Sequence, residues 1–392
     1  MTGPAKVAVV GAGLAGLRTI EELRAKGYPG RVTLIGAETR PPYDRPPLSK
    51  KLLAGELDDT SLRADLDSLD IDARLGEVAT KLRPGVLSTD TGEHEFDALV
   101  LATGAAPVRL PGPGPQHVLR TLDDALKLRE LLQPRTRLCV VGAGWIGAEL
   151  TTAARRRDCQ VTVLEAAATP LAAAVGPDIG AITATWYEEA GAELRVGQQV
   201  ASIEDGGVAL GGGDWVAADV VVTAIGVRPA VAWLDGSGVD LDNGVAVDAR
   251  LRTTMPGVFA AGDCASFWSQ RYGRRLRFEH WDVALHQPEV VADGLLGGGA
   301  SYDPVPYFWS EQFGRMVQYV GWHGGADQVV WRGDPAAPKW ALCWLAGGRL
   351  AAALTVSSPR DMLQARRLIE SGVQADPARL ADPAIAIRDC AA

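Results

Sequence analysis

The sequence has few cysteines, no long apolar run and no excess of positive charge. Five cysteines occur among 392 residues, and no two of them form a C-x-x-C pair. Scattered cysteines in an odd number argue against a disulfide scaffold or a cysteine-held metal, so we expect no metal site. No apolar stretch reaches the roughly 18 residues that a membrane-spanning helix needs. The start of the chain lacks a signal-like apolar segment, and we therefore expect a cytoplasmic protein with no membrane contact.

The charge balance narrows the classes of partner. The formal net charge is −9, with 47% hydrophobic and 22% charged residues, which is typical of a soluble globular protein. An acidic chain disfavours general nucleic-acid binding, which relies on clustered positive charge. A length of 392 residues predicts two or three domains.

An internal repeat organises the first half of the chain. Residues 7–16 read "VAVVGAGLAG" and residues 138–147 read "LCVVGAGWIG", 131 positions later. Each apolar strand leads into a glycine turn, a helical pattern and a second apolar strand, at 31–38 and at 160–166. This order predicts a β-α-β unit that occurs twice in the chain.

A second repeat extends each unit. Strand-like segments at 97–104 and 219–226 each run from Asp to Gly, and short alternating runs before them predict small antiparallel meanders. The stretch 236–248 reads as loop, and 257–261 reads as another buried strand. After the glycines at 297–299 we expect a separate α+β domain, with strands in "RMVQYVGW" and "KWALCWLAGGRLAAALTV" and a helix near 359–372.

The first glycine turn has the features of a dinucleotide site. Gly11 permits the tight turn, Gly13 lets the backbone approach a pyrophosphate, and Gly16 lets the helix pack on the strand. The N-terminus of the following helix offers free N–H groups to phosphate. Glu38, 22 residues after Gly16, ends the next strand, where a carboxylate can accept bonds from ribose hydroxyls.

The second turn repeats the arrangement with Gly142, Gly144 and Gly147, followed by Glu165. A carboxylate at this position accepts from a 2′-hydroxyl and repels a 2′-phosphate, and no arginine follows it closely, so NADH is favoured over NADPH. The alternative is that Glu165 only ends a strand in solvent.

Two such sites in one chain indicate a bound flavin and a diffusible nicotinamide that exchange electrons. Gly262-Asp263, after the strand at 257–261, fits a flavin site, because an aspartate there can bind ribityl hydroxyls; the alternative is a simple turn. The segment "ETRPPYDRPPLSK" at 38–50 has four prolines, which exclude ordinary helix or central strand. It has no cysteine, which disfavours a thiol-based NADH oxidase, peroxidase or disulfide reductase.

Several motifs together resemble the FAD-dependent, NADH-using ferredoxin and rubredoxin reductases that serve bacterial P450s and aromatic-ring dioxygenases. In order along the chain they are "VGAGLAG", "YDRPPLSK", "LATG", "VGAGWIGAE", "IGVRP", "LRTTMPGVFAAGDCA", "FEHWDVALHQ", "VPYFWSEQFG" and "SPRDMLQARRLI". The resemblance implies an α/β fold on the glutathione-reductase-like plan, with two Rossmann-like dinucleotide-binding domains and an α+β C-terminal domain. The domains would be an FAD domain at 1–111 and 236–303, an NADH domain at 112–235 and a C-terminal domain at 304–392.

The resemblance also implies which residues bind the two cofactors. For FAD they are Gly11, Gly13, Leu14, Ala15, Gly16, Glu38, Arg45, Lys50, Ala79, Ala102, Thr103, Gly104, Gly262, Asp263, Glu279, His280 and Trp281. For NADH they are Gly142, Gly144, Trp145, Ile146, Gly147, Glu165, Ile225 and Gly226. Lys50 would lie beside the isoalloxazine as a pair with Glu149, where a cation stabilises reduced flavin. The alternatives are a solvated loop lysine and an ordinary first-turn acid. Tyr307 and Phe308 are expected in the core.

The implied reaction is hydride transfer from NADH to FAD, followed by single-electron transfer to a [2Fe–2S] ferredoxin or a rubredoxin. An acidic ferredoxin would need a local basic patch, and the candidates are Arg271, Arg274, Arg275, Arg277 and Arg315; the alternative is a solvated basic loop. The other functions left open are an NADH-sensing, partner-binding flavoprotein, as apoptosis-inducing factors are, and an NADH oxidase-type flavoenzyme. The sequence leaves monomer or dimer undecided.

Overall fold

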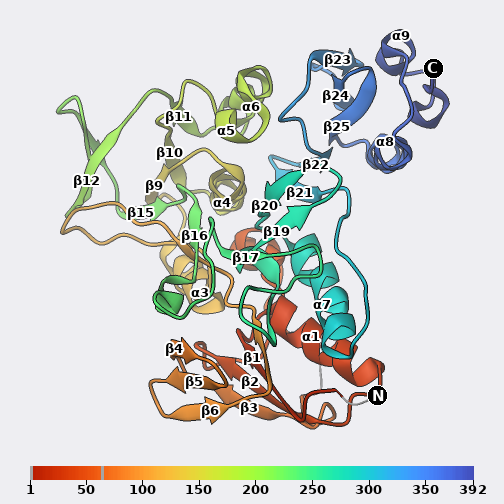
Figure 1. Ribbon diagram of the computed structural model, residues 1–392. Helices are drawn as coiled ribbons and strands as arrows, with labels where there is room; N and C mark the ends of the chain where they lie inside the picture. The colour runs from red at the N-terminus through yellow and green to blue at the C-terminus, as the bar shows by residue number, and fades with distance from the viewer. Residues whose placement is uncertain (1–2, 63–65) are drawn as a thin grey trace. The chain divides into compact units, whose positions relative to one another are not determined.

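The computed structural model describes residues 3–62 and 66–392. The chain folds into two compact units, and each unit is assembled from three separate segments (Figure 1). The first consists of Met1–Pro46, Asp59–Pro107 and Val227–Asp303, and the second of Pro47–Asp58, Val108–Gly226 and Pro304–Ala392. No helix in the described part of the chain is long and apolar enough to cross a membrane.

A five-stranded parallel sheet forms the centre of the first unit. Its strands lie in the order β18-β7-β1-β2-β3, with bounds Val258–Ala260, Ala98–Leu101, Lys6–Val10, Arg31–Gly36 and Asp72–Leu75. The middle strands are mostly apolar and buried because a parallel sheet is covered on both faces. Helices α1 (Leu14–Ala25) and α7 (Trp281–Leu295) run side by side (Figure 1).

Three smaller sheets complete the first unit. One is the antiparallel meander β4-β5-β6, one joins β8 to β16, and one joins β17, β19 and β20. The meander consists of β4 (Ala79–Arg83), β5 (Val86–Thr89) and β6 (Glu93–Glu95). The two-stranded sheet consists of β8 (Ala105–Pro107) and β16 (Val227–Pro229). The third sheet consists of β17 (Val245–Val247), β19 (Ala265–Ser269) and β20 (Arg274–Leu276). The expectation of loop throughout 236–248 was wrong at β17. Its three apolar residues are buried and pair in parallel with β19, a contact that local sequence does not reveal.

A four-stranded parallel sheet forms the centre of the second unit. Its order is β11-β10-β9-β15, with bounds Glu193–Arg195, Gln160–Leu164, Arg137–Val141 and Val220–Thr223. Strand β9 lies between β10 and β15 just as β1 lies between β2 and β7, so the predicted repeat is confirmed. The predicted second meander is present as β12, β13 and β14, at Val200–Glu204, Gly207–Leu210 and Trp215–Ala217.

Five helices accompany this sheet, and the longest two are α4 and α6. The helices are α2 (Lys51–Ala54), α3 (Leu122–Leu131), α4 (Trp145–Arg156), α5 (Ala172–Val175) and α6 (Pro177–Glu189). A capping box at Thr121 and Asp124 begins α3. The proline-rich segment ends in a short 3-10 helix, Pro46–Ser49, and leads directly into α2, which packs against α3 and α4.

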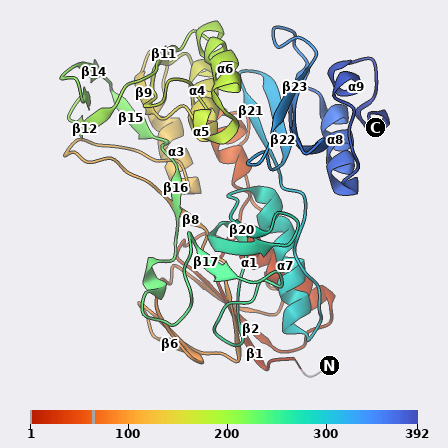
Figure 2. The ribbon, with the colours of Figure 1, turned by 45° about the horizontal axis from the view of Figure 1, so that its top comes forward.

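The last part of the chain forms a five-stranded antiparallel sheet in the order β21-β22-β25-β24-β23. Figure 2 labels three of its strands, β21, β22 and β23. The bounds are Tyr307–Gln312, Arg315–Gly321, Arg349–Val356, Trp340–Ala346 and Gln328–Arg332. Helix α8 (Pro359–Ser371), the helix expected near 359–372, packs against β22 and β25, and α9 (Pro377–Ala381) follows.

The C-terminal sheet belongs to the second compact unit because its apolar face packs on α6. Trp186 and Ile179 of α6 share one buried cluster with Tyr319, Trp340 and Trp344. The segment Pro47–Asp58 also belongs to this unit, through the contacts of α2. The boundaries of the two compact units therefore differ from those of the three predicted domains, and the three-domain division stays a prediction.

Candidate functional site

The first glycine turn is closely packed at two positions and open at the third. A Cβ placed on Gly11, whose φ is +115°, would lie 2.0 Å from the carbonyl oxygen of Ala102, and a Cβ on Gly16 would lie 2.0 Å from that of Gly11. A Cβ on Gly13 would meet no described atom within 4 Å. Gly13 is the N-cap of α1 and has no side chain with which to cap it. The N–H groups of this helix end are therefore left for an anion.

Other predicted residues surround this turn. Ala102 follows β7, and its N–H donates to the carbonyl of Val10 at 2.7 Å. The Thr103 hydroxyl donates to the carbonyl of Ala230 at 2.9 Å, which fixes the stretch before Gly104. A Cβ on Gly262 would lie 3.0 Å from that of Ala15, so the Gly262-Asp263 turn lies beside the start of α1, where Leu14 is the first residue.

Glu38 and Arg45 lie together at the end of β2. Oε1 of Glu38 is 2.7 Å from a guanidinium nitrogen of Arg45, and its Oε2 accepts from the Tyr43 hydroxyl at 2.6 Å. Burial would lower the pKa of Arg45, but the charges of Tyr43, Glu38 and Asp263 outweigh it and raise that pKa. Three residues predicted for FAD are therefore close in space, and the carboxylate of Glu38 is held in place before any ribose binds.

The remaining residues predicted for FAD each have contacts of their own within the first unit. The indole N–H of Trp281 donates to Asp44 at 2.9 Å, and His280 caps α7 by accepting from the N–H of Asp282 at 3.2 Å. Glu279 forms an ion pair with Arg277 at 2.5 Å. Ala79 begins β4 and is partly buried against the core of the unit.

The second glycine turn has the same design as the first. A Cβ on Gly142, at φ +104°, would lie 2.5 Å from the carbonyl oxygen of Ala224, and one on Gly147 would lie 2.0 Å from that of Gly142. Gly144, the N-cap of α4, is open in the same sense as Gly13, with no described atom within 4 Å of a Cβ built there. The stretch Ala224 to Gly226 follows β15 and lies beside this turn.

Glu165 binds the backbone of the second turn. Its Oε2 accepts from the N–H of Ala143 at 2.7 Å, and its Oε1 accepts from that of Ala167 at 2.8 Å. Each carboxylate oxygen can accept more than one bond, so the held carboxylate can still receive a ribose hydroxyl. Ile146 and Ile225 are exposed, as a ligand-facing pair would be. The ring of Trp145 instead packs edge-on against Phe308, with centroids 4.7 Å apart.

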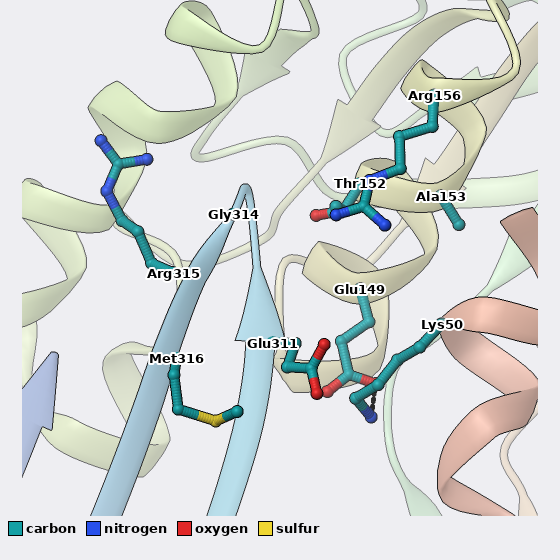
Figure 3. A pocket seen from close by; sticks show the side chains of 9 residues that line it. All are labelled: Lys50, Glu149, Thr152, Ala153, Arg156, Glu311, Gly314, Arg315 and Met316. Carbon is teal, nitrogen blue, oxygen red and sulfur yellow. Dashed lines mark hydrogen bonds and ion pairs between the residues drawn. The ribbon is translucent and has the colours of Figure 1, made fainter. Parts of the chain in front are cut away.

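Lys50 and Glu149 form the ion pair that the resemblance implies. The Lys50 ammonium lies 2.8 Å from Oε2 of Glu149, and their side chains are 14% and 3% exposed (Figure 3). Removing one member of so buried a pair typically costs about 3–5 kcal/mol. Neither residue is the solvated group that the alternatives described, and Glu149 lies beyond the first turn of α4.

A pocket of about 210 Å³ opens beside this pair (Figure 3). Helix α4 and the hairpin of β21 and β22 supply most of its wall. The lining residues are Lys50, Glu149, Thr152, Ala153, Arg156, Glu311, Gly314, Arg315 and Met316.

Two serines in contact with Glu149 were missed from the sequence. The hydroxyl of Ser49 donates to Oε2 of Glu149 and that of Ser310 donates to Oε1, each at 2.5 Å. Both serines lie inside quoted motifs, "YDRPPLSK" and "FWSEQFG", and this was the signal that could have identified them. Phe308 packs against a buried cluster but, like Tyr307, is itself only half-buried, so neither is the fully buried core residue that was expected.

The five candidate docking arginines differ in how they are engaged. Arg271 and Arg274 are exposed. Arg275 donates to the carbonyls of Val247 and Ser266, and Arg277 is only 10% exposed. Arg315 pairs with Glu189 at 2.6 Å and lies over the ring of Trp186. Three of the five are thus committed to bonds within their own unit.

The cysteines are buried, and none is bonded to another described cysteine. Burial raises the pKa of Cys139 and of Cys343 to about 12. Within residues 3–62 and 66–392 no cluster of three or more acidic, histidine or cysteine side chains could hold a metal ion. The described residues offer neither an activated thiol nor a metal centre.

The two open glycine turns with their acids are suited to two dinucleotides, and comparison with known proteins agrees. Residues 5–287 match the family model described as pyridine nucleotide-disulphide oxidoreductase, and residues 307–391 match the one described as reductase C-terminal.

Relatives and solved structures extend over the whole chain. The ferredoxin–NAD(+) reductase component of the anthranilate 1,2-dioxygenase system from Burkholderia cepacia is 38% identical, over 97% of this chain and 98% of the relative. The crystal structure of Fdr9 is 48% identical with a TM-score of 0.94, covering 97% and 99% of the two chains. The reductase in the covalent putidaredoxin reductase–putidaredoxin complex is 31% identical with a TM-score of 0.95, covering 99% and 98%.

A protein with this fold and these two turns is a two-dinucleotide flavoprotein of the α/β class. The chain belongs to the pyridine nucleotide-disulphide oxidoreductase family, in the group of ferredoxin reductases of dioxygenase and P450 systems. Proteins of this family use FAD and a pyridine nucleotide.

Proposed function

We propose that this protein is an NADH-dependent ferredoxin reductase that supplies electrons to a dioxygenase or P450 oxygenase. The observation that carries this proposal is the presence of two open glycine turns in a chain that is similar over its full length to such reductases. Bound FAD would take two electrons from NADH and release them singly to an iron–sulfur protein. The residues of the chain itself bind and orient the two dinucleotides and provide charge.

The first unit holds FAD in this proposal. The N–H groups at the start of α1 bind the pyrophosphate, and Glu38, held by Arg45 and Tyr43, binds the adenosine ribose. Asp263 binds the ribityl chain. Trp281, fixed through Asp44, contacts the flavin.

The second unit holds NADH. The start of α4 binds the pyrophosphate and Glu165 accepts from the ribose 2′-hydroxyl. Because two backbone N–H groups fix the carboxylate of Glu165, it cannot turn away from a 2′-phosphate, so NADPH is disfavoured. Lys50 supplies the positive charge that an electron-rich reduced flavin favours, and Glu149 fixes its ammonium.

The electron acceptor in this proposal is a [2Fe–2S] ferredoxin of acidic character. Arg271 and Arg274 are the candidates for docking, since both are exposed and lie on the hairpin of β19 and β20. Trp268, 43% exposed on β19, offers an aromatic contact next to them.

The test is the absorbance spectrum of the purified protein during titration with NADH and, separately, with NADPH. We expect a bound flavin that NADH bleaches at lower concentration than NADPH does. Added [2Fe–2S] ferredoxin should then sustain steady reduction of cytochrome c. The proposal fails if no flavin is bound, or if NADPH alone reduces it. A long-lived reduced NAD complex without turnover would favour the sensing flavoprotein.

A further inference from the structure

One face of helix α4 packs along strand β21. Trp145, Glu149 and Thr152 are spaced by four and three residues, so they share that face. Each has a partner on or just after β21. The contacts are Trp145 with the ring of Phe308, Glu149 with the hydroxyl of Ser310, and Thr152 Oγ1 with the N–H of Phe313 at 2.9 Å. The C-terminal sheet therefore holds the helix that carries Glu149 at three successive points.

Glu149 receives hydrogen bonds from two segments of the chain that are far apart in sequence, residues 49–50 and residue 310. Its Oε2 accepts from Ser49 and Lys50, and its Oε1 accepts from Ser310. With both oxygens bonded from opposite sides, the carboxylate cannot rotate about its Cγ–Cδ bond without breaking a bond. A carboxylate held by Lys50 alone would keep that freedom.

The direction of the Ser310 bond is set by its neighbour. The side-chain amide N–H of Gln312 donates to Oγ of Ser310 at 3.1 Å, and Gln312 is only 1% exposed. An amide N–H can only donate and an ionised carboxylate can only accept, so the Ser310 proton points to Glu149. A hydroxyl that accepts one bond while donating another is a stronger donor.

We propose that Ser310, on the C-terminal sheet, is a positioning residue for Lys50, acting through Glu149 and assisted by Ser49 from the other side. Ser310 fixes the Glu149 carboxylate, and the fixed carboxylate fixes the Lys50 ammonium at the wall of the pocket. The role of this ammonium at a flavin rests on the proposed function, but its fixation does not. The C-terminal sheet thus contributes a side chain to the redox site besides its packing surface.

The first experiment measures how firmly Lys50 is held, with no need of turnover. The full-length protein is acetylated with limiting acetic anhydride, and modification of Lys50 is measured by mass spectrometry relative to exposed Lys51. In Ser310→Ala and in Ser49→Ala we expect Lys50 to react about fivefold faster, the factor that an ordinary hydrogen bond is worth. Ser310→Thr keeps a hydroxyl and should restore slow labelling.

Thr355→Val is the matched control. Thr355 lies on β25 of the same sheet, is fully buried, and its hydroxyl has no hydrogen-bond partner among the described residues. Its loss should leave Lys50 labelling unchanged. A change as large in this control as in Ser310→Ala would show a general loosening of the sheet and overturn the proposal.

The second experiment measures the flavin midpoint potential and uses a double-mutant cycle. Ser310→Ala should make the potential more negative, since a less firmly held cation stabilises reduced flavin less. In a Glu149→Gln background the same substitution should add no further shift if Ser310 acts through Glu149. Unchanged Lys50 labelling in both serine variants refutes the positioning role, even where ferredoxin turnover is intact. Absence of flavin would defeat the proposed function and leave the labelling result valid.

Discussion

Lys50 is the residue whose removal tests the redox site most directly. Lys50→Ala should leave FAD bound and slow flavin reduction by NADH on the order of 100- to 1000-fold, the loss that removal of one preorganised donor causes at other sites. Stopped-flow absorbance measures the rate. Lys51→Ala is the control, because Lys51 is exposed and adjacent in the chain. Reduction at the unaltered rate in Lys50→Ala would remove Lys50 from the mechanism.

Two buried thiols give a pH dependence of stability. Burial raises the pKa of Cys139 and Cys343 from 9.0 to about 12. The folded protein holds both protons to higher pH than the unfolded chain does, so their contribution is fully present below pH 9. It is lost as the pH rises from 9 towards 12. Urea unfolding between pH 7.5 and 10 should show falling stability, and Cys343→Ala should show a shallower fall. An equal slope in that variant would contradict the assignment.

Among the elements, the glycine turn before α4 has a geometry that tolerates little change. Gly142→Ala places a methyl group 2.5 Å from the Ala224 carbonyl oxygen at φ +104°, so the turn must shift. We expect NADH affinity to fall by about tenfold or more while FAD remains bound, because strain of this kind costs about 1–3 kcal/mol. Gly212→Ala is a suitable control, since a Cβ there meets no described atom within 4 Å and the turn lies outside both sites. Equal affinities in the two variants would refute the assignment of this turn to NADH.

The same elements show how far sequence reasoning could go. Strands such as 7–10 and 138–141 were predictable because buried parallel strands are continuous apolar runs that end at glycine. Strand β17 was not, since its three residues form a strand only by pairing with β19. Ser310 was missed for a similar reason. A serine gives no periodic signal, and its partner Glu149 is 161 positions away in the sequence.

The charge of the whole molecule opposes an acidic partner. With a net charge of −9, attraction has to come from a local patch, and screening by salt should weaken it. We expect ferredoxin-mediated cytochrome c reduction to fall as ionic strength rises. Arg271→Ala/Arg274→Ala should raise the KM for ferredoxin and flatten this salt profile. NADH-to-ferricyanide activity of the variant is the control, and a salt profile that is flat in the unmodified protein would argue against electrostatic docking.

The way the second unit is assembled has a consequence for its synthesis. Its segments begin at Pro47, Val108 and Pro304, and the bonds to Glu149 join residues 49, 149 and 310. A nascent chain on the ribosome can complete this unit only after its last segment has emerged. Until then Glu149 on α4 lacks the hydrogen bond from Ser310. Contacts of such long range also slow folding, so a chaperone that shields the apolar face of α6 should raise the yield of the active protein.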